Sequence, residues 1–258
     1  IAFNISNAEE SSKSDLKWYP YNKGGNYRKW YGNNEFVLNW KHNGIELKNY
    51  KKSVIRNENY QLREGITWSL INSSFGGRYF EKGHLFDVGG SGTFPNHDII
   101  YYITGLLNTK LVNEFLKILN PTLNFQVGNI ASLPIIINEE YKEKIEQIVK
   151  ENIEISKNDW DDFETSWDFK NHPLLKNRMI EISDRIYVKQ KIADIYKNWK
   201  NKCNERFNRL KQNEEKLNSI FIDIYGLQDI LNPEMEDRDI TIRKSNLERE
   251  IKSLISYA

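Results

Sequence analysis

The feature that most constrains the fold is a long stretch between Pro173 and Gly226 that contains neither proline nor glycine. Apolar residues recur in it at near-heptad spacing, and this rhythm is interrupted at Lys189, Lys200 and Glu214. The pattern predicts either one very long helix or an antiparallel pair of helices. A helix of this length exceeds a compact domain, so it must pack along a second helix or a partner. The apolar positions are 179, 182, 186, 193, 196, 203, 207, 210, 217 and 221.

Helical spacing predicts three further helices upstream. Two of them cover roughly residues 97–108 and 109–119, and Asn120-Pro121 ends the second. A long amphipathic helix is expected to begin at Asn138, a residue type that commonly caps helix N-termini. The acidic and aromatic residues 159–168 interrupt this pattern, and we expect them to form a solvated connector.

The first half of the chain differs in composition from the second. Glycine pairs occur there, and residues 35–40 and 66–71 are rich in strand-forming side chains. Residues 1–135 carry 15 basic and 11 acidic side chains, whereas residues 136–258 carry 22 and 25. The predicted class is therefore α+β: a mixed-sheet domain over 1–135, followed by a helical region over 136–258 with a coiled-coil-like segment.

Composition excludes several classes of protein. Of the 258 residues 39% are hydrophobic, yet no apolar run approaches 18 residues, so neither a disordered chain nor a membrane span is expected. The single cysteine, Cys203, can form neither an intrachain disulfide nor a cysteine-rich zinc site, which favours the cytoplasm. The chain begins with Ile1 and lacks a signal-peptide pattern, so we expect it to be a piece of a longer protein.

No motif predicts a self-contained active site. Residues 86–92 are rich in glycine, but residues 93–96 follow before the next predicted helix, which favours a turn at a sheet edge over a cofactor loop. The carboxylates of residues 159–168 have no histidine at ligand spacing, and the four histidines are scattered without a hydrolase motif. We therefore assign no catalytic, cofactor-binding or metal-ligating residue.

Residues 17–31 interleave cations with aromatic rings around the pair Gly24-Gly25. Cations suit DNA phosphates, while rings can stack on bases and amide or guanidinium groups can hydrogen-bond base edges. A core aromatic cluster with exposed lysines and a sugar-binding platform are the alternatives. The candidate DNA-binding residues are Lys17, Tyr19, Tyr21, Lys23, Asn26, Tyr27, Arg28, Lys29 and Trp30.

Several motifs carry a resemblance that runs in order along most of the chain. They are residues 18–33, 65–69, 106–111, 119–130, 159–167 and 217–227. Together they resemble the C-terminal part of the PglX family, the adenine-specific DNA methyltransferases of the BREX phage-exclusion systems. Residues 1–135 would then be a DNA target-recognition domain, and residues 136–258 a helical spacer or docking region.

The resemblance implies a division of labour in the parent protein. Its S-adenosylmethionine loop and its Asn-Pro-Pro-aromatic motif for adenine are not matched here, so the cofactor and the catalytic residues would lie in a methyltransferase domain outside this chain. Double-stranded DNA, that domain and other BREX proteins are the implied partners, with no membrane. This chain alone is expected to lack activity and to supply target choice for N6-adenine methylation. The alternative is a protein-interaction module that recruits defence partners without contacting DNA.

Overall fold

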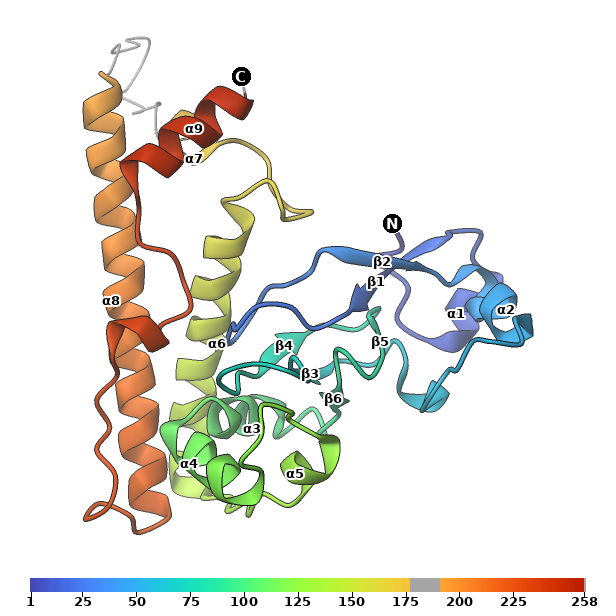
Figure 1. Cartoon of the computed structure of the whole chain (residues 1–258), viewed down its shortest axis with the longest axis horizontal. Helices are drawn as coiled ribbons and strands as arrows, with labels where there is room; N and C mark the ends of the chain where they lie inside the picture. The colour runs from blue at the N-terminus through green and yellow to red at the C-terminus, as the bar shows by residue number, and fades with distance from the viewer. Residues whose placement is uncertain (177–190, 258) are drawn as a thin grey trace.

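The computed structural model describes residues 1–176 and 191–257 (Figure 1). Two long helices lie side by side and antiparallel along one edge of the molecule, and the strands and shorter helices extend from them to the other side. The two are α6 (Glu139–Asp161) and α8 (Ile192–Ile224). α8 has 33 residues, so a single long helix that packs along a second one is confirmed over this range. Predicted apolar positions 179, 182 and 186 lie outside the described residues.

The other predicted helices form where their capping residues indicated. α3 (Ile100–Leu107) is followed by α4 (Lys110–Leu119), whose N-cap Thr109 accepts a hydrogen bond from the amide of Val112 and whose C-cap is Asn120. Asn138 caps α6 by accepting hydrogen bonds from two amides of the first turn. The remaining helices are α1 (Ala8–Lys13), α2 (Lys41–Asn49), η1 (Glu58–Tyr60), α5 (Val127–Ala131), α7 (Pro173–Lys176), η2 (Asp237–Asp239) and α9 (Leu247–Tyr257).

Two small sheets complete the α+β fold, which agrees with the predicted class. In the first sheet β1 (Trp18–Asn22) pairs antiparallel with β2 (Phe36–Asn39) and parallel with β5 (Leu85–Phe86). In the second, β3 (Gly65–Thr67) lies between β4 (Arg78–Phe80) and β6 (Gly92–Thr93), antiparallel to both. Residues 86–92 form the connection between the two sheets, so their interpretation as a turn beside a sheet is confirmed.

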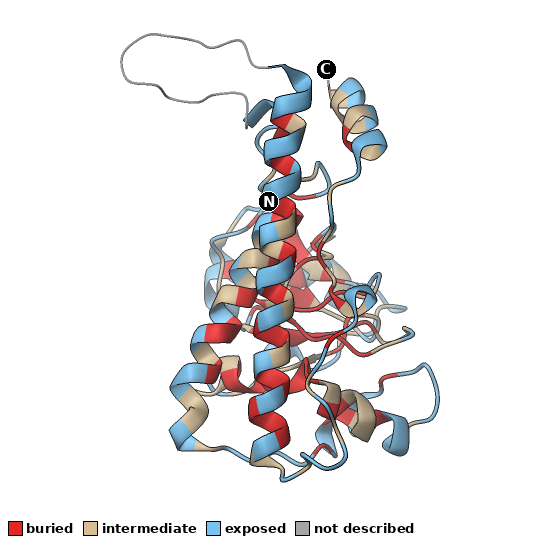
Figure 2. Cartoon of the chain, turned by 90° about the vertical axis from the view of Figure 1, so that its left-hand side faces the viewer, coloured by how far each residue is buried: buried red, intermediate tan, exposed pale blue. Residues whose placement is uncertain are grey.

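One apolar core joins the predicted recognition domain to the predicted helical region. It contains Ile66 and Ile103 from before residue 135, and Val149 and Phe221 from after it. Gly105 lets α3 approach α6 closely, because a Cβ there would lie 2.9 Å from a methyl group of Val149. Figure 2 shows the buried residues that run along α8 toward this core. Sheet and long helices are therefore packed into one body around residue 105.

Two smaller apolar clusters lie away from that core. One gathers Tyr19, Trp40 and Leu85 around β1. The other, formed by Leu174, Ile195, Trp199 and Cys203, lies where α7 meets the N-terminal end of α8. Within residues 1–176 and 191–257, no helix has the length and apolar character needed to cross a membrane.

Candidate nucleic-acid interface

The nine predicted DNA-binding residues divide by exposure. Lys17, Lys23 and Asn26 are exposed, and the rings of Tyr21 and Tyr27 are partly buried. The remaining four, whose relative exposures range from 0% to 6%, are Tyr19, Arg28, Lys29 and Trp30. The alternative interpretation, a core aromatic cluster with exposed lysines, fits Lys17 and Lys23 but not Lys29, which is as deeply buried as the rings beside it.

Arg28 is held by α6. Its Nη2 donates to Oδ2 of Asp159 at 2.8 Å and to the carbonyl oxygen of Ser156 at 3.2 Å, and its Nε donates to the carbonyl oxygen of Tyr31 at 2.7 Å. The guanidinium also stacks over Trp160, with Cζ 5.1 Å from the ring centroid. The Nε and Nη2 donors are thus used inside the protein, and the residue is only 6% exposed, which leaves the group poorly placed to contact a phosphate.

Lys29 and Trp30 are held by α8. The Lys29 ammonium donates to Oε2 of the buried Glu214 carboxylate, and the Trp30 indole donates to its Oε1 at 2.7 Å. Burial lowers the pKa of Lys29, but the facing carboxylate outweighs it, so the net shift is upward. Trp30 has a φ of 70°, a left-handed conformation that is uncommon for a bulky residue, and backbone hydrogen bonds with Gly77 and Tyr79 hold it there.

The same contacts overturn the prediction of a solvated connector for residues 159–162, whereas residues 163–168 do lie in turns, with Glu164, Thr165 and Asp168 exposed. α6 continues to Asp161, and Asp159, Trp160 and Asp162 are buried. The carboxylates can be buried because cations accompany them: Asp159 pairs with Arg28, and Asp162 pairs with Arg206. This acidic stretch is therefore a point of attachment between the sheets and the long helices.

The exposed part of the predicted segment centres on Asp87. Its carboxylate accepts hydrogen bonds from the Tyr21 hydroxyl, from Lys23 at 3.1 Å and from the amides of Gly89 and Gly90 at 2.7 and 3.2 Å. Burial raises the pKa of Asp87, but these donors outweigh it and lower the pKa below its ordinary value. Asp87 is thus an anchored carboxylate whose negative charge is offset locally.

Two glycine-rich turns pack backbone against backbone at this point. A Cβ on Gly90 would lie 2.4 Å from the carbonyl oxygen of Asn22, and a Cβ on Gly24 would lie 2.5 Å from that of Gly89. Gly24 also has a φ of 90°. The glycines of residues 86–92 therefore serve close packing against the turn after β1, which accounts for the motif without a cofactor.

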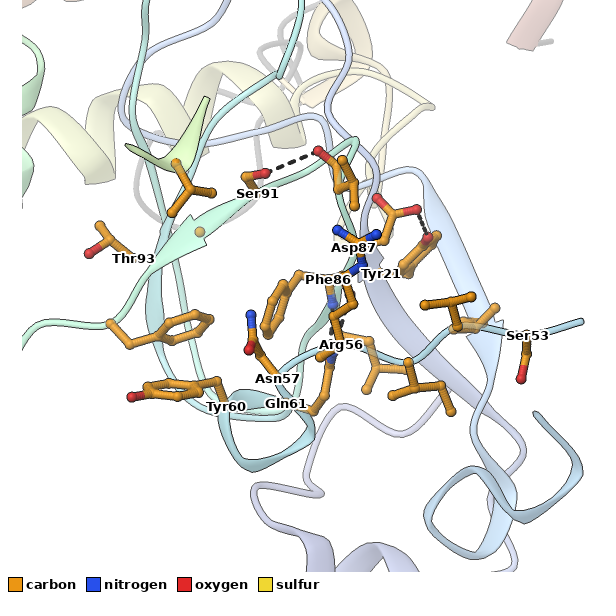
Figure 3. Close-up of a pocket in the computed structure, with 18 of the residues that line it drawn as sticks. Tyr21, Ser53, Arg56, Asn57, Tyr60, Gln61, Phe86, Asp87, Ser91 and Thr93 are labelled. Atoms are coloured by element: carbon orange, nitrogen blue, oxygen red, sulfur yellow. Dashed lines mark hydrogen bonds between the residues drawn. The ribbon is translucent and has the colours of Figure 1, made fainter. Parts of the chain in front are cut away.

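A groove of about 920 Å³ lies beside Asp87, bounded by residues 53–61, the turn after β5 and the start of α5. Figure 3 shows Arg56, Asn57, Tyr60 and Phe86 around the same space, with Tyr21 and Asp87 at its far side. The rings of Tyr60 and Phe86 each lie about 5 Å from that of Phe94, with centroid distances of 5.1 and 5.0 Å. The groove thus combines an aromatic wall with polar side chains.

Of the residues that the structure describes, one cation, Arg56, lines this groove, and three others lie in or beside the segments that form it. Lys51, Lys52 and Arg56 are exposed and form no ion pair within the described residues, and Arg63 lies over the Tyr60 ring. The nearby carboxylate of Glu58 is paired with Lys48. The surface can therefore attract a polyanion and hold flat, apolar groups beside it.

The sequence did not identify the residues of this groove as a site. Its cations were counted only among the basic residues of the first half, and Asn57, Tyr60 and Gln126 were not predicted to have a role. The available signal was the run from Tyr50 to Arg56, where three cations follow an aromatic residue within seven positions. Among the described residues, no cluster of histidine, cysteine and carboxylate side chains has the arrangement of a metal site.

The chain matches no family model. Two curated relatives are adenine-specific methyltransferases, and both similarities cover most of this chain. The first is PglX of Lacticaseibacillus casei (strain Zhang), 41% identical over 252 residues, which are 94% of this chain and 20% of that protein. The second is BrxX of Escherichia coli O9:H4 (strain HS), 37% identical over 228 residues, 87% of this chain and 18% of that protein.

These matches confirm the resemblance to PglX that the sequence motifs indicated. The chain spans about one fifth of the length of the curated relatives that it matches. It is therefore similar to one segment of these methyltransferases.

Proposed function

We propose that this chain is the DNA-specificity segment of an N6-adenine DNA methyltransferase of the BREX type. In this proposal it docks double-stranded DNA and presents the target adenine to a catalytic domain of the same protein, which binds S-adenosylmethionine. The similarity to PglX and BrxX along most of the chain supports the methyltransferase context.

The observation that carries the DNA-binding role is the charge at the groove. Arg56 lines the concave aromatic surface, Lys51 and Lys52 lie in the exposed segment that leads to it, and Arg63 lies over the Tyr60 ring. None of these cations has a carboxylate partner among the described residues, and Asp87 is already satisfied by its own donors. Free surface cations displace counterions from DNA and so supply affinity, whereas ion-paired ones contribute little.

The proposed DNA face keeps part of the segment predicted from the sequence. Lys17 and Asn26 are exposed and Tyr21 lines the groove, so these residues stay within the proposal. Lys23 is also exposed, but its ion pair with Asp87 leaves it a smaller share in DNA binding. Arg28 and Lys29 are assigned a positioning role instead, because their charges are held by carboxylates of α6 and α8.

A specific surface favours a second candidate function, docking of a protein partner. Ile71, Ile118, Leu119, Leu123 and Val127 are 43% to 81% exposed. They adjoin one another, since Ile71 bridges to Asn124 and α4 and α5 are in contact. An exposed apolar surface of this kind fits the catalytic domain or another BREX protein.

Titration of labelled duplex DNA with the 258-residue chain, followed by fluorescence anisotropy at several salt concentrations, tests the DNA-binding role. Replacing Lys51, Lys52 and Arg63 together with alanine should weaken binding and reduce the log–log salt slope by about 0.9 for each phosphate that no longer meets a cation. A matched control removes three cations from α8 and should leave both quantities unchanged; its changes are Lys197→Ala, Lys200→Ala and Lys216→Ala. Equal losses in both triple variants, or no DNA binding by the parent chain, would favour the protein-docking function.

A further inference from the structure

We propose that Arg56, Asn57 and Gln126 are the residues that hydrogen-bond base edges and so determine which DNA sequence this chain selects. The inference rests on the proposed function and adds to it the specificity-determining side chains. All three line the groove.

These three side chains keep their hydrogen-bonding groups free. Within residues 1–176 and 191–257 no hydrogen bond or ion pair engages the Arg56 guanidinium or the carboxamides of Asn57 and Gln126. Gln61 in the same groove is a contrast: its carboxamide accepts from the Phe86 amide at 3.0 Å and donates to the Phe86 carbonyl at 3.2 Å. The carboxamide of Gln61 is thus occupied by hydrogen bonds within the protein, whereas the other three side chains are available to a ligand.

The backbone presents these free groups from fixed positions. Asn57 has a φ of 51°, a left-handed conformation that asparagine tolerates well, and it immediately precedes η1. Beyond η1, the amide of Leu62 donates to the carbonyl of His84 at 3.0 Å, which ties this segment to the sheet. A specificity site needs such preorganisation, because a group that moves freely discriminates poorly between partners.

The backbone next to Gln126 is held in place as well. The preceding residue, Phe125, donates its amide to the carbonyl of Leu70 at 2.7 Å and accepts from the Trp68 indole at 2.8 Å. Gln126 is the N-cap of α5, yet its side chain makes no capping hydrogen bond. Its side chain can therefore be changed without removing a cap.

The chemistry of the three groups matches the edges of base pairs in duplex DNA. A guanidinium can donate two hydrogen bonds to O6 and N7 of guanine, and an asparagine or glutamine carboxamide can pair with N6 and N7 of adenine. Lys51 and Lys52 are exposed in the segment that leads to Ser53 at the groove, and Arg63 lies over the Tyr60 ring that lines it, so these cations would meet phosphates near the bound bases. The cations Lys51, Lys52 and Arg63 favour DNA as the ligand, because they would add no affinity for a neutral or basic peptide.

Selection from a pool of duplexes with a randomised segment, using the full 258-residue chain and sequencing of the bound fraction, tests this assignment. We expect Arg56→Ala to lose preference for guanine at one position, and Asn57→Gly and Gln126→Ala to lose preference for adenine at others. Each loss should be roughly 5- to 150-fold in the ratio of right to wrong base. Glycine at position 57 keeps the left-handed backbone, so thermal melting should show all three variants folded.

Lys52→Ala is the matched control, because its expected effect is weaker binding to every sequence with an unchanged selected motif. The inference is overturned if the parent chain selects a motif and all three groove variants select the same one. It is also overturned if they only weaken binding uniformly, as Lys52→Ala should. A parent chain that binds no duplex, or selects no motif, would refute the proposed function itself, and this result is seen before any variant is made.

Discussion

Replacing Lys29 with methionine removes the cation that faces Glu214 in the interior of the protein. Both side chains are 2% exposed, so the carboxylate left behind can neither reach water nor find another cation close by. Losing one partner of a buried ion pair typically costs about 3–5 kcal/mol, compared with about 0–1 kcal/mol for an exposed pair. We expect Lys29→Met to lower the free energy of unfolding by about 3–5 kcal/mol at pH 8.

The cost should depend on pH in a defined direction. Burial already raises the pKa of Glu214, with Lys29 opposing the shift, so loss of Lys29 must raise it further. A carboxyl group whose folded pKa is raised contributes stability that is fully present below its unfolded pKa, about 4.5, and is lost as the pH rises through its folded pKa. The destabilisation by Lys29→Met should therefore be smaller at pH 5 than at pH 8.

Urea denaturation of single and double variants measures this prediction. Adding Glu214→Gln to Lys29→Met removes the stranded charge but leaves an oxygen that can still accept from the Trp30 indole, so the double variant should be more stable than Lys29→Met. Lys48→Met is the control, because its pair with Glu58 is partly exposed and should contribute about 1 kcal/mol or less. The reasoning is refuted if Lys29→Met costs less than 1 kcal/mol at pH 8, or if the effects of the two single changes simply add.

Three further outcomes can be measured directly. Burial lowers the pKa of His84 to about 4, so the free energy of unfolding should fall by up to about 3 kcal/mol as the pH drops from 6.5 toward 4. In thermal melts, His84→Gln should flatten this part of the dependence of stability on pH. Gly90→Ala should lower the free energy of unfolding by about 1–3 kcal/mol, because its Cβ would be forced against the Asn22 backbone. Gly128 has open space around it, so Gly128→Ala should be neutral or slightly stabilising in the same urea denaturation assay. Calorimetry with S-adenosylmethionine should detect no binding to the chain, and micromolar affinity would show that the residues around Gly90 form a cofactor loop after all.

The helices could be predicted from the sequence because their signals are local. Asn138 and Asn120 act within a few residues of their position, and apolar spacing reports the buried face of a helix whatever it packs against. The positions of α3, α4, α6 and α8 followed from these signals, whereas α1, α2, α5 and α9 were not predicted. The resemblance to PglX followed from motifs that keep their order along the chain.

The environment of the candidate site could not be predicted in the same way, because burial depends on distant partners. The carboxylates that hold Arg28 and Lys29 lie 131 and 185 positions further along the chain. Without that pairing, a cation between aromatic residues has the same sequence signature whether it lies in a core or on a DNA-binding surface. Arg56 and Asn57 were missed for the converse reason: isolated polar residues in a loop are distinguished only once folding places them in one groove.

The buried pair between Lys29 and Glu214 also attaches α8 to the segment between β1 and β2 at a point far from the N-terminal end of that helix. Glu214 lies 22 residues from the start of that helix, so at 1.5 Å per residue about 33 Å of rigid helix extends beyond the point where Lys29 is gripped. A tilt of about 10° of the sheets that preserves this grip would displace the far tip of the helix by about 6 Å, given that length. Such a displacement would be passed on to α7 and α9, because residues of both helices pack against this end of α8.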